Sequence, residues 1–291
     1  MKKTKLLLLL VSFILVACGE YHGYDADDAK SPYVPRKGAF MVKSLKTTSV
    51  YNGNEYSWEH KFKYDAHKRI KEVSSNITFY AEDKWEGTYQ GKRTSVAKYY
   101  YLDNDIDVVY TVSFEYPKYP AKNRTYDGTD EGVFDPKTGL LSSYSALDFV
   151  YSGQTLTAAY ADGGRRYEIT RDRDNNVTGY NVEDDYDGSL ITANGNKYNY
   201  LSRENNTNFD FSGYLGYWGV EEELVPNASP YYAAYQLAAF GFLGSTGKHL
   251  PVGEPVKTDT GETVMGKWEF DESGRPVVFT ESSGRKTVVT Y

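Results

Sequence analysis

Four oxygen-bearing side chains in the middle of the chain are spaced like the ligands of a calcium loop. They are Asp172, Asp174, Asn176 and Glu183, which fall at positions 1, 3, 5 and 12 of the helix-loop-helix calcium pattern. Position 6, where that pattern needs glycine for a sharp turn, is Val177, and strands instead of helices are expected on both sides. A polar hairpin turn with solvated charges accounts for the same residues. We therefore carry two interpretations, a metal site and a turn.

Three tryptophans are candidates for ligand binding: Trp85, Trp58 and Trp218. Aromatic rings beside Asp and Asn side chains can stack on sugar rings while the polar groups hydrogen-bond the sugar hydroxyls. Trp85 is the first choice, because charged residues at 82–84 precede it and Gly87 follows it, which indicates a hairpin tip. For any single ring, packing in the core or pairing across strands is the favoured interpretation.

Motifs for catalysis and cofactor binding are missing from the sequence. The histidines His22, His60, His67 and His249 form no pair with metal-ligand spacing. No Gly-x-Ser-x-Gly elbow occurs, and the run 243–248 lacks the first glycine of a phosphate-binding loop. The 40 Asp and Glu residues place some acid pairs together by chance, so they do not indicate a glycoside hydrolase. We predict no catalytic residue and no cofactor, and keep a glycan-active hydrolase as the weakest alternative.

The only cysteine, Cys18, ends an export signal. Lysines at positions 2, 3 and 5 precede an apolar run at 6–17, a length typical of a signal peptide and short for a membrane span. Residues 15–19 (LVACG) have the form of the bacterial lipobox, in which the thiol takes a diacylglyceryl group before cleavage. The following residue is glycine and not the aspartate that retains lipoproteins at the inner membrane. We predict a signal peptide at 1–17, lipidation of Cys18 and an outer-membrane location, with the periplasmic or surface side left open.

The charge and composition of the rest define the mature protein. A net charge of −7 without an evident basic cluster excludes nucleic acid as a partner, so membrane attachment must come through the lipid. Residues 18–38 are acidic and contain proline and glycine without an apolar period, which predicts a flexible tether. No later linker breaks the chain. We therefore expect one β-rich domain over 39–291.

Alternation and turn residues predict an all-β, mainly antiparallel fold. The chain has 29 Tyr against 3 Met, and residues 106–114 alternate apolar and polar side chains with a period of two. Asn-Gly, Asp-Gly and Ser-Gly pairs recur between such runs. The pattern predicts a single large curved meander sheet or a porin-like open barrel.

A short motif recurs along this meander. The strand, Asp-initiated turn and strand of 62–70 return at 268–277, and in part at 133–140 and 171–177. The aspartate, Asp65 in the first copy and Asp271 in the second, is expected to cap the turn by accepting backbone N–H bonds. We interpret the motif as a reused hairpin and not as a functional signature.

One segment, 229–243, departs from the β pattern and predicts a helix. Ser229 and Pro230 suit the N-cap and first helical position, and Gly244 suits the end. The segment is apolar nearly all round, so the helix is expected to be buried in the concavity of the sheet.

Together these features resemble a family of Bacteroidetes lipoproteins that carry a domain of unknown function with a porin-like fold. The resemblance lies in the lipobox at Cys18, the Tyr-Asp hairpins, the polar run 205–211, and the helix ending at Gly244 with 247–251 after it. The chain departs from the family pattern at 66–68, where a glycine usually precedes the arginine. The resemblance implies a fold and no activity.

We expect a lipid-anchored binding or scaffolding module of the cell envelope, with a glycan, a peptide or another envelope protein as its partner. The alternative is an integral outer-membrane β-barrel that forms a pore, which the alternating C-terminal strand at 284–291 favours. Charged residues opposite the apolar face of several strands favour the module.

Overall fold

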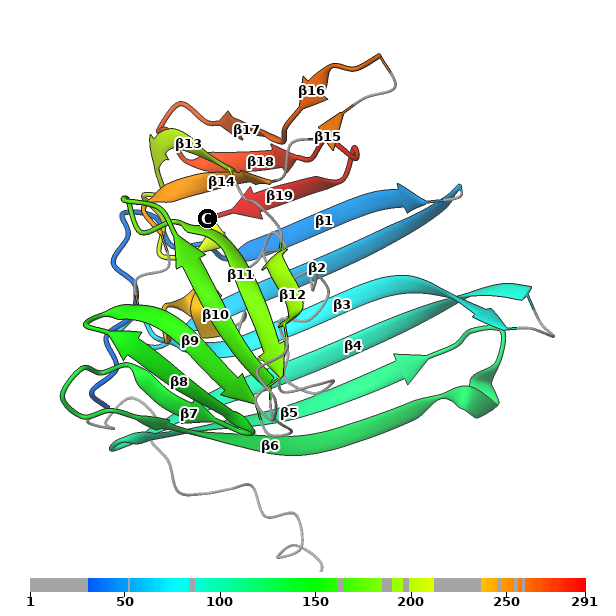
Figure 1. Ribbon diagram of the computed structural model, residues 1–291. Coiled ribbons are helices and arrows are strands. Elements are labelled where there is room, and N and C mark those ends of the chain that lie inside the picture. The colour runs from blue at the N-terminus through cyan, green and yellow to red at the C-terminus, as the bar shows by residue number, and fades with distance from the viewer. Residues whose placement is uncertain are drawn as a thin grey trace, which may run out of the picture.

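The computed structural model describes residues 31–51, 53–83, 87–161, 165–184, 190–195, 199–211, 237–244, 247–253, 256–257 and 260–291. Strands dominate these ranges (Figure 1), with one helical turn at 237–240. The strands and the single 3-10 turn, η1, are β1 (Ser44–Tyr51), β2 (Asn54–Tyr64), β3 (Ile70–Asp83), β4 (Gly87–Leu102), β5 (Asp105–Glu115), η1 (Pro120–Lys122), β6 (Arg124–Phe134), β7 (Leu141–Tyr144), β8 (Leu147–Ser152), β9 (Thr155–Ala161), β10 (Arg165–Arg171), β11 (Val177–Asp184), β12 (Leu190–Gly195), β13 (Asn199–Glu204), β14 (His249–Gly253), β15 (Val256–Lys257), β16 (Thr263–Val264), β17 (Lys267–Phe270), β18 (Pro276–Thr280) and β19 (Lys286–Thr290).

One antiparallel meander forms most of the protein. A 15-stranded sheet runs in the order β12 to β1 and then continues through β19, β18 and β17. The C-terminal strands therefore add to β1, and the edge strands β12 and β17 do not pair with each other, so the sheet is not a closed barrel. The all-β antiparallel prediction, with one large curved sheet, is confirmed. Among the described residues, no helix reaches the length and apolar character that crossing a membrane requires.

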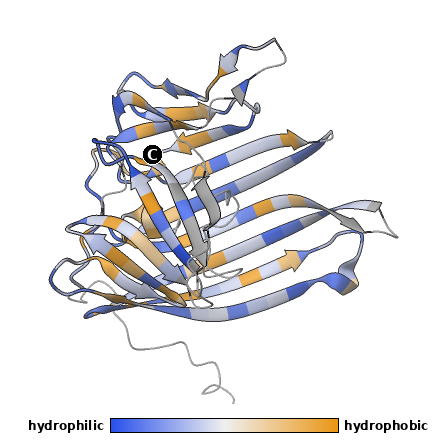
Figure 2. Cartoon of the chain, viewed as in Figure 1, coloured by the Kyte–Doolittle hydropathy of each residue, from blue (hydrophilic) through white to orange (hydrophobic). Residues whose placement is uncertain are grey.

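The strands are long on one side of the sheet and short on the other. β3 and β4 have 14 and 16 residues, whereas β7 has 4. Figure 1 shows the long strands β2–β6 extending well past the end where β7–β12 gather. Hydrophobic and hydrophilic residues are interleaved along the strands (Figure 2), because successive side chains point to opposite faces. The inner face therefore continues beyond the packed core.

Segments from outside the sheet fill its concave side. Tyr33, Phe209 and Phe242 are 5%, 0% and 0% exposed and belong to one hydrophobic cluster with the inner residues of the strands. The ring of Tyr33 stacks on that of Phe242 with centroids 4.4 Å apart, and its hydroxyl donates to the Phe240 carbonyl oxygen at 2.7 Å. Burial raises the pKa of Tyr33 far above its usual value, so this phenol stays neutral. The folded part therefore begins before residue 39, inside the segment predicted as a tether.

The described end of the predicted helix is buried. Residues 237–240 are helical, and Leu237 and Ala239 are 1% and 0% exposed. The rest of the predicted span 229–243 on its N-terminal side lies outside the described residues. The buried end agrees with the expected plug in the concavity.

The repeated hairpin motif has the predicted cap. Asp65 Oδ1 accepts hydrogen bonds from the backbone N–H of His67 and of Arg69, both at 2.9 Å, and Asp65 Oδ2 accepts one from Arg69 Nε at 2.5 Å. The same set of bonds recurs around Asp271. The cap prediction is confirmed there and in the partial copies at Asp135 and Asp172.

The turn also explains why glycine suits the position before the arginine. Gly274 and Lys68 occupy equivalent positions and have φ of 78° and 65°. A side chain in this left-handed region costs about 1–2 kcal/mol relative to glycine. The first hairpin carries that cost at Lys68, and the buried pair formed by Asp65 and Arg69 offsets it.

Removing the capping carboxylate should cost more in the first hairpin than in the second. The side chains of Arg69 and Asp65 are 4% and 1% exposed, whereas those of Arg275 and Asp271 are 36% and 24% exposed. Asp65→Ala leaves a buried guanidinium without its partner and should lower the free energy of unfolding by about 3–5 kcal/mol. Asp271→Ala should cost about 1–2 kcal/mol. Urea denaturation of both variants measures the difference, and equal losses would contradict the role given to burial.

Candidate binding surface on the inner face

Six aromatic rings form a continuous row across β3–β6, beyond the packed core. The row, called here the aromatic ladder, consists of Tyr119, Tyr89, Tyr116, Phe79, Phe114 and Tyr126 in spatial order. Neighbouring ring centroids are 5.3, 5.8, 6.0, 6.4 and 6.2 Å apart, and all five pairs are edge-to-face. Such pairs contribute about 0.5–1.5 kcal/mol each beyond area burial, so the rings hold one another in place.

Strand alternation puts the ladder on the same face as the core. Phe114 lies on β5 with the buried Val112, and Phe79 lies on β3 with the buried Ile77, in each case two residues further along. The register aligns Phe114 with Arg93 of β4 on one side and with Arg124 of β6 on the other. The core and the ladder are thus two parts of one inner surface.

Glycines let rings lie flat on this surface. Phe79 pairs across strands with Gly91, and Tyr110 pairs with Gly128. A Cβ at Gly91 would lie 2.5 Å from Phe79 Cζ, and one at Gly128 would lie 2.3 Å from the Tyr110 hydroxyl oxygen. Each ring therefore occupies the space that a side chain on the facing residue would take. This arrangement turns the other face of the ring away from the sheet.

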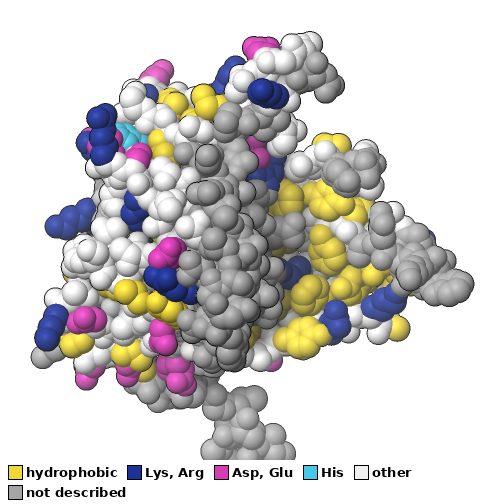
Figure 3. Space-filling model, in the orientation of Figure 1, with side chains coloured by type: hydrophobic (Ala, Val, Ile, Leu, Met, Phe, Trp, Pro, Cys, Tyr) yellow, Lys and Arg dark blue, Asp and Glu magenta, His cyan; other side chains and the backbone are white. Residues whose placement is uncertain are grey.

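Cations from the connection between β5 and β6 lie against both ends of the ladder. Arg124 Cζ is 5.6 Å from the Phe114 ring centroid and 5.7 Å from that of Tyr126. Lys122 Nζ is 5.1 Å from the Tyr89 centroid and 4.9 Å from that of Tyr119. Figure 3 shows hydrophobic side chains and Lys or Arg side chains gathered on a hollowed face over the long strands. Tyr126 is 47% exposed, so part of the ladder is open to solvent.

A carboxylate lies further along β6, toward the core. Asp130 shares the inner face with Tyr126 and Gly128 and accepts a hydrogen bond from the Tyr144 hydroxyl at 3.4 Å. Burial raises the pKa of Asp130, and the bond from Tyr144 partly opposes this. Burial and the nearby Asp130 also raise the pKa of Tyr110. The surface therefore offers flat rings, hydroxyls, cations beside the rings and a carboxylate toward the core.

A buried polar row separates the ladder from the core. His60 is 0% exposed, and its Nδ1 lies 2.7 Å from Ser75 Oγ on the next strand. Ser95 follows in register on β4, and its Oγ has no hydrogen-bond partner. Burial, with a smaller effect from Arg93, lowers the pKa of His60 to about 3, so the imidazole is neutral at physiological pH. Being inaccessible to solvent, this pair is structural.

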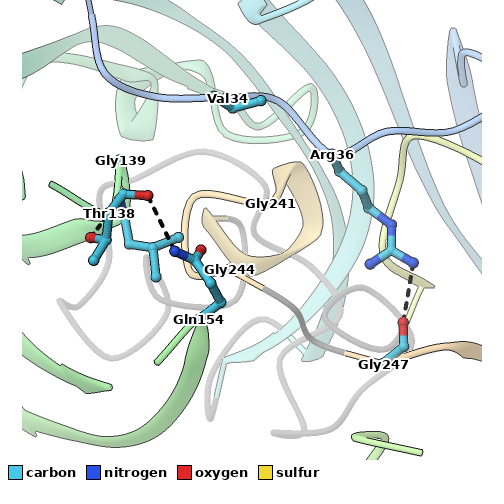
Figure 4. Close-up of a pocket in the computed structure, with 9 residues that line it drawn as sticks. Val34, Arg36, Thr138, Gly139, Gln154, Gly241, Gly244 and Gly247 are labelled. Carbon is cyan, nitrogen blue, oxygen red and sulfur yellow. Dashed lines mark hydrogen bonds between the residues drawn. The ribbon is translucent and has the colours of Figure 1, made fainter. Parts of the chain in front are cut away.

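A pocket of about 380 Å³ lies away from the ladder. It is lined by Val34, Arg36, Thr138, Gly139, Leu140, Gln154, Gly241, Gly244 and Gly247. In Figure 4 Arg36 points toward Gly247, and the Gly247 carbonyl oxygen accepts a hydrogen bond from Arg36 Nη2 at 3.2 Å. Gln154 points toward Thr138. Arg36 Nη1 also pairs with the buried Asp210 at 3.3 Å. The lining is mostly backbone, and its one charge is already paired, so the pocket offers less chemistry than the ladder.

The predicted binding tryptophans do not form the ladder. Trp58 is 5% exposed and packs near Tyr56, with ring centroids 6.3 Å apart, so its ring is not open to a ligand. Trp85 and Trp218 lie outside the described residues. Sequence reasoning missed the ladder, although period-two aromatic residues on neighbouring strands were a usable signal. It also missed the cations at 118–124, because the net charge of the whole chain is negative.

The predicted calcium ligands are engaged in turn and packing bonds. Asp172 Oδ1 accepts the backbone N–H of Asp174 and of Asn176, both at 2.9 Å. Asn176 Oδ1 accepts the backbone N–H of Lys248 at 2.9 Å and of His249 at 3.0 Å. Burial opposes ionisation of Asp172, but the hydrogen bonds outweigh it and lower its pKa.

The described acidic and histidine residues also include no group of three or more that could hold a metal ion. Glu183 lies on β11 opposite Arg166, away from the turn. The geometry therefore fits the turn interpretation.

The outer face of the long strands is polar. Lys63 pairs with Glu72 at 2.7 Å and Lys61 with Glu59 at 3.4 Å. Thr111 Oγ1 donates to Asp127 Oδ1 at 2.5 Å. A strand face in contact with hydrocarbon must be apolar, so this face does not support the alternative of an integral pore.

No family model matches the sequence, and neither does any curated protein. The fold is similar to that of a porin-like protein from Bacteroides uniformis, with a TM-score of 0.41 and 10% sequence identity over 86% of this chain and 97% of that chain.

Mutation of Asn176 should be costly, and calcium should have no effect. Asn176→Ala leaves the N–H groups of Lys248 and His249 without their acceptor and should lower the free energy of unfolding by about 1–3 kcal/mol. The matched control, Asp174→Asn, changes an exposed side chain and should be neutral. Millimolar calcium should leave the melting temperature of the wild type unchanged. A rise with calcium that Asp174→Asn abolishes would restore the metal-site interpretation.

Proposed function

We propose that this protein is a lipid-anchored module of the outer membrane that binds a glycan on the aromatic ladder. The observation that carries the proposal is the ladder itself, a row of mutually supported rings on a concave face that continues beyond the core. A protein normally buries such rings. Rings that are partly exposed and fixed in orientation are suited to stacking on the apolar faces of sugars.

Polar groups beside the rings fit the same ligand class. Hydroxyls of Tyr126 and Tyr110 can donate to sugar oxygens, and Asp130 can accept from sugar hydroxyls. The rings are held by strand register and cross-strand glycines, so little ordering entropy is lost when a rigid sugar binds.

The predicted lipid anchor at Cys18 supports the outer-membrane location. Lipidation at Cys18 would hold the domain at the membrane, because several acyl chains together give stable attachment whereas one chain does not. The charged outer face then contacts water, and the ladder remains available to envelope or external polysaccharide.

Truncating one exposed ring of the ladder should weaken glycan binding. Tyr126→Ala removes a ring that is 47% exposed and should reduce affinity about tenfold, a loss of roughly 1.4 kcal/mol. The control, Tyr100→Ala, removes a ring from the opposite face of β4 and should leave affinity unchanged. Isothermal calorimetry of the full chain in detergent against bacterial, plant and host polysaccharides measures both. Binding that survives Tyr126→Ala would move the site, and no binding by the wild type would overturn the function.

Removing the acylated thiol should release the protein from membranes. Cys18→Ser should shift the full chain from the carbonate-resistant membrane fraction to the soluble fraction, with an unchanged melting temperature for the folded domain. A variant that still pellets after carbonate extraction would show that something other than lipid holds the protein.

A further inference from the structure

We infer that the ligand of the ladder is an acidic polysaccharide whose anionic groups are bound by Lys118, Lys122 and Arg124. This inference rests on the proposed glycan-binding function and adds the chemical class of the glycan. It is carried by the placement of three cations beside aromatic rings within one short connection between β5 and β6.

Each of the three cations lies over an aromatic ring of the ladder. Lys118 Nζ lies 5.5 Å from the Tyr119 ring centroid, close to Lys122 over the same ring, and Arg124 lies over Phe114. All three side chains belong to exposed residues. Lys118 and Arg124 have no carboxylate within ion-pair distance in the described part of the chain, unlike Lys63 and Lys61 on the outer face.

The acids nearest to Lys118 and Arg124 in sequence belong to the outer face. Glu115 lies there opposite Lys92 of β4, and Asp127 points there, where Thr111 donates to it. Asp130 is six residues from Arg124 along the same strand, which corresponds to roughly 20 Å. The connection is therefore a local positive patch on a chain whose net charge is −7. An attractive potential for anions at both ends of an aromatic row favours a ligand with both acidic groups and apolar ring faces.

Packing on the rings also prepares the cations for binding. Contact with an exposed ring restricts a long side chain without burying its charge. A guanidinium stacked on a ring keeps its edge N–H groups directed outward, where they can bind a carboxylate or sulfate in a bidentate manner. The sugar ring and its acidic group would thus be bound by neighbouring residues.

Single-stranded nucleic acid has the same two features, bases that stack and a backbone that is anionic. Three cations on an acidic chain make a poor track for a phosphate backbone, since affinity depends on the number of phosphates neutralised. We therefore favour the polysaccharide, and the nucleic acid becomes an outcome of the test.

The test compares matched polymers that differ only in charge. Polygalacturonate and its methyl-esterified form make one pair, and chondroitin sulfate and its desulfated, carboxyl-reduced form make a second. Calorimetry of the full chain in detergent should show the acidic member binding about tenfold tighter in at least one pair. The preference should shrink as salt rises from about 50 to 200 mM, because exposed charges are screened.

Variants separate the charge preference from binding itself. The double variant Lys122→Gln with Arg124→Gln should lose the preference for the acidic polymer while keeping its affinity for the neutral one. Lys98→Gln, on the outer face of β4, is the control and should keep the preference. Unchanged melting temperatures would show that all variants are folded.

Each outcome decides a different claim. Equal binding of acidic and neutral polymers, or a preference that survives the double variant, would overturn the acidic ligand and leave the proposed glycan function standing. Tighter binding of a single-stranded oligonucleotide than of either acidic polymer would overturn it in favour of nucleic acid. Absence of binding to every polysaccharide would overturn the proposed function as well.

Discussion

The concave side of a strongly curved sheet must be filled, and every other feature of this protein depends on how that filling is achieved. Strand residues alone cannot reach across the hollow, so rings from distant segments meet there. Tyr33 stacks on Phe242, and Phe209 and Phe240 pack against Phe62 of the sheet. These rings belong to the segments 31–43, 207–211 and 237–244, which are brought together only by the curvature. The core therefore depends on the curvature of the sheet.

The filling also defines where the inner face can bind. Strands β2–β6 are longer than the filled part requires, so the same alternation that supplies Val112 to the core supplies Phe114 to the ladder two residues later. The polar row of His60, Ser75 and Ser95 crosses β2–β4 in register with Val112 of β5, and on those strands it ends the apolar interior. The same alternation thus supplies core residues at one end of the strands and the proposed binding surface at the other. The two ends differ in whether other segments cover the inner face.

Local signals in the sequence predicted the elements, while the site depended on information that local signals lack. Alternation and Asx turns are properties of short windows, so the antiparallel sheet and the cap at Asp65 could be predicted. The ladder needs the register between β3, β4, β5 and β6, which places Phe79 opposite Gly91 and Phe114 opposite Arg124. The pattern at 172–183 lacks the same information, because Asn176 faces the distant backbone of His249. Burial of Tyr33 was equally hidden, since its partners come from far along the chain.

The path of the N-terminal segment has a mechanical consequence. Before the chain enters β1, Tyr33 is inserted among Tyr101, Phe134 and Phe242, and Arg36 is bound to Asp210 and Gly247. Gly139 lies so close to Pro32 that a Cβ there would be 2.3 Å from the proline oxygen. A force applied to the chain before Ser31 therefore acts first on the packing of Tyr33 and on the contacts of Arg36. It reaches the hydrogen bonds between β1 and its neighbouring strands only after those contacts.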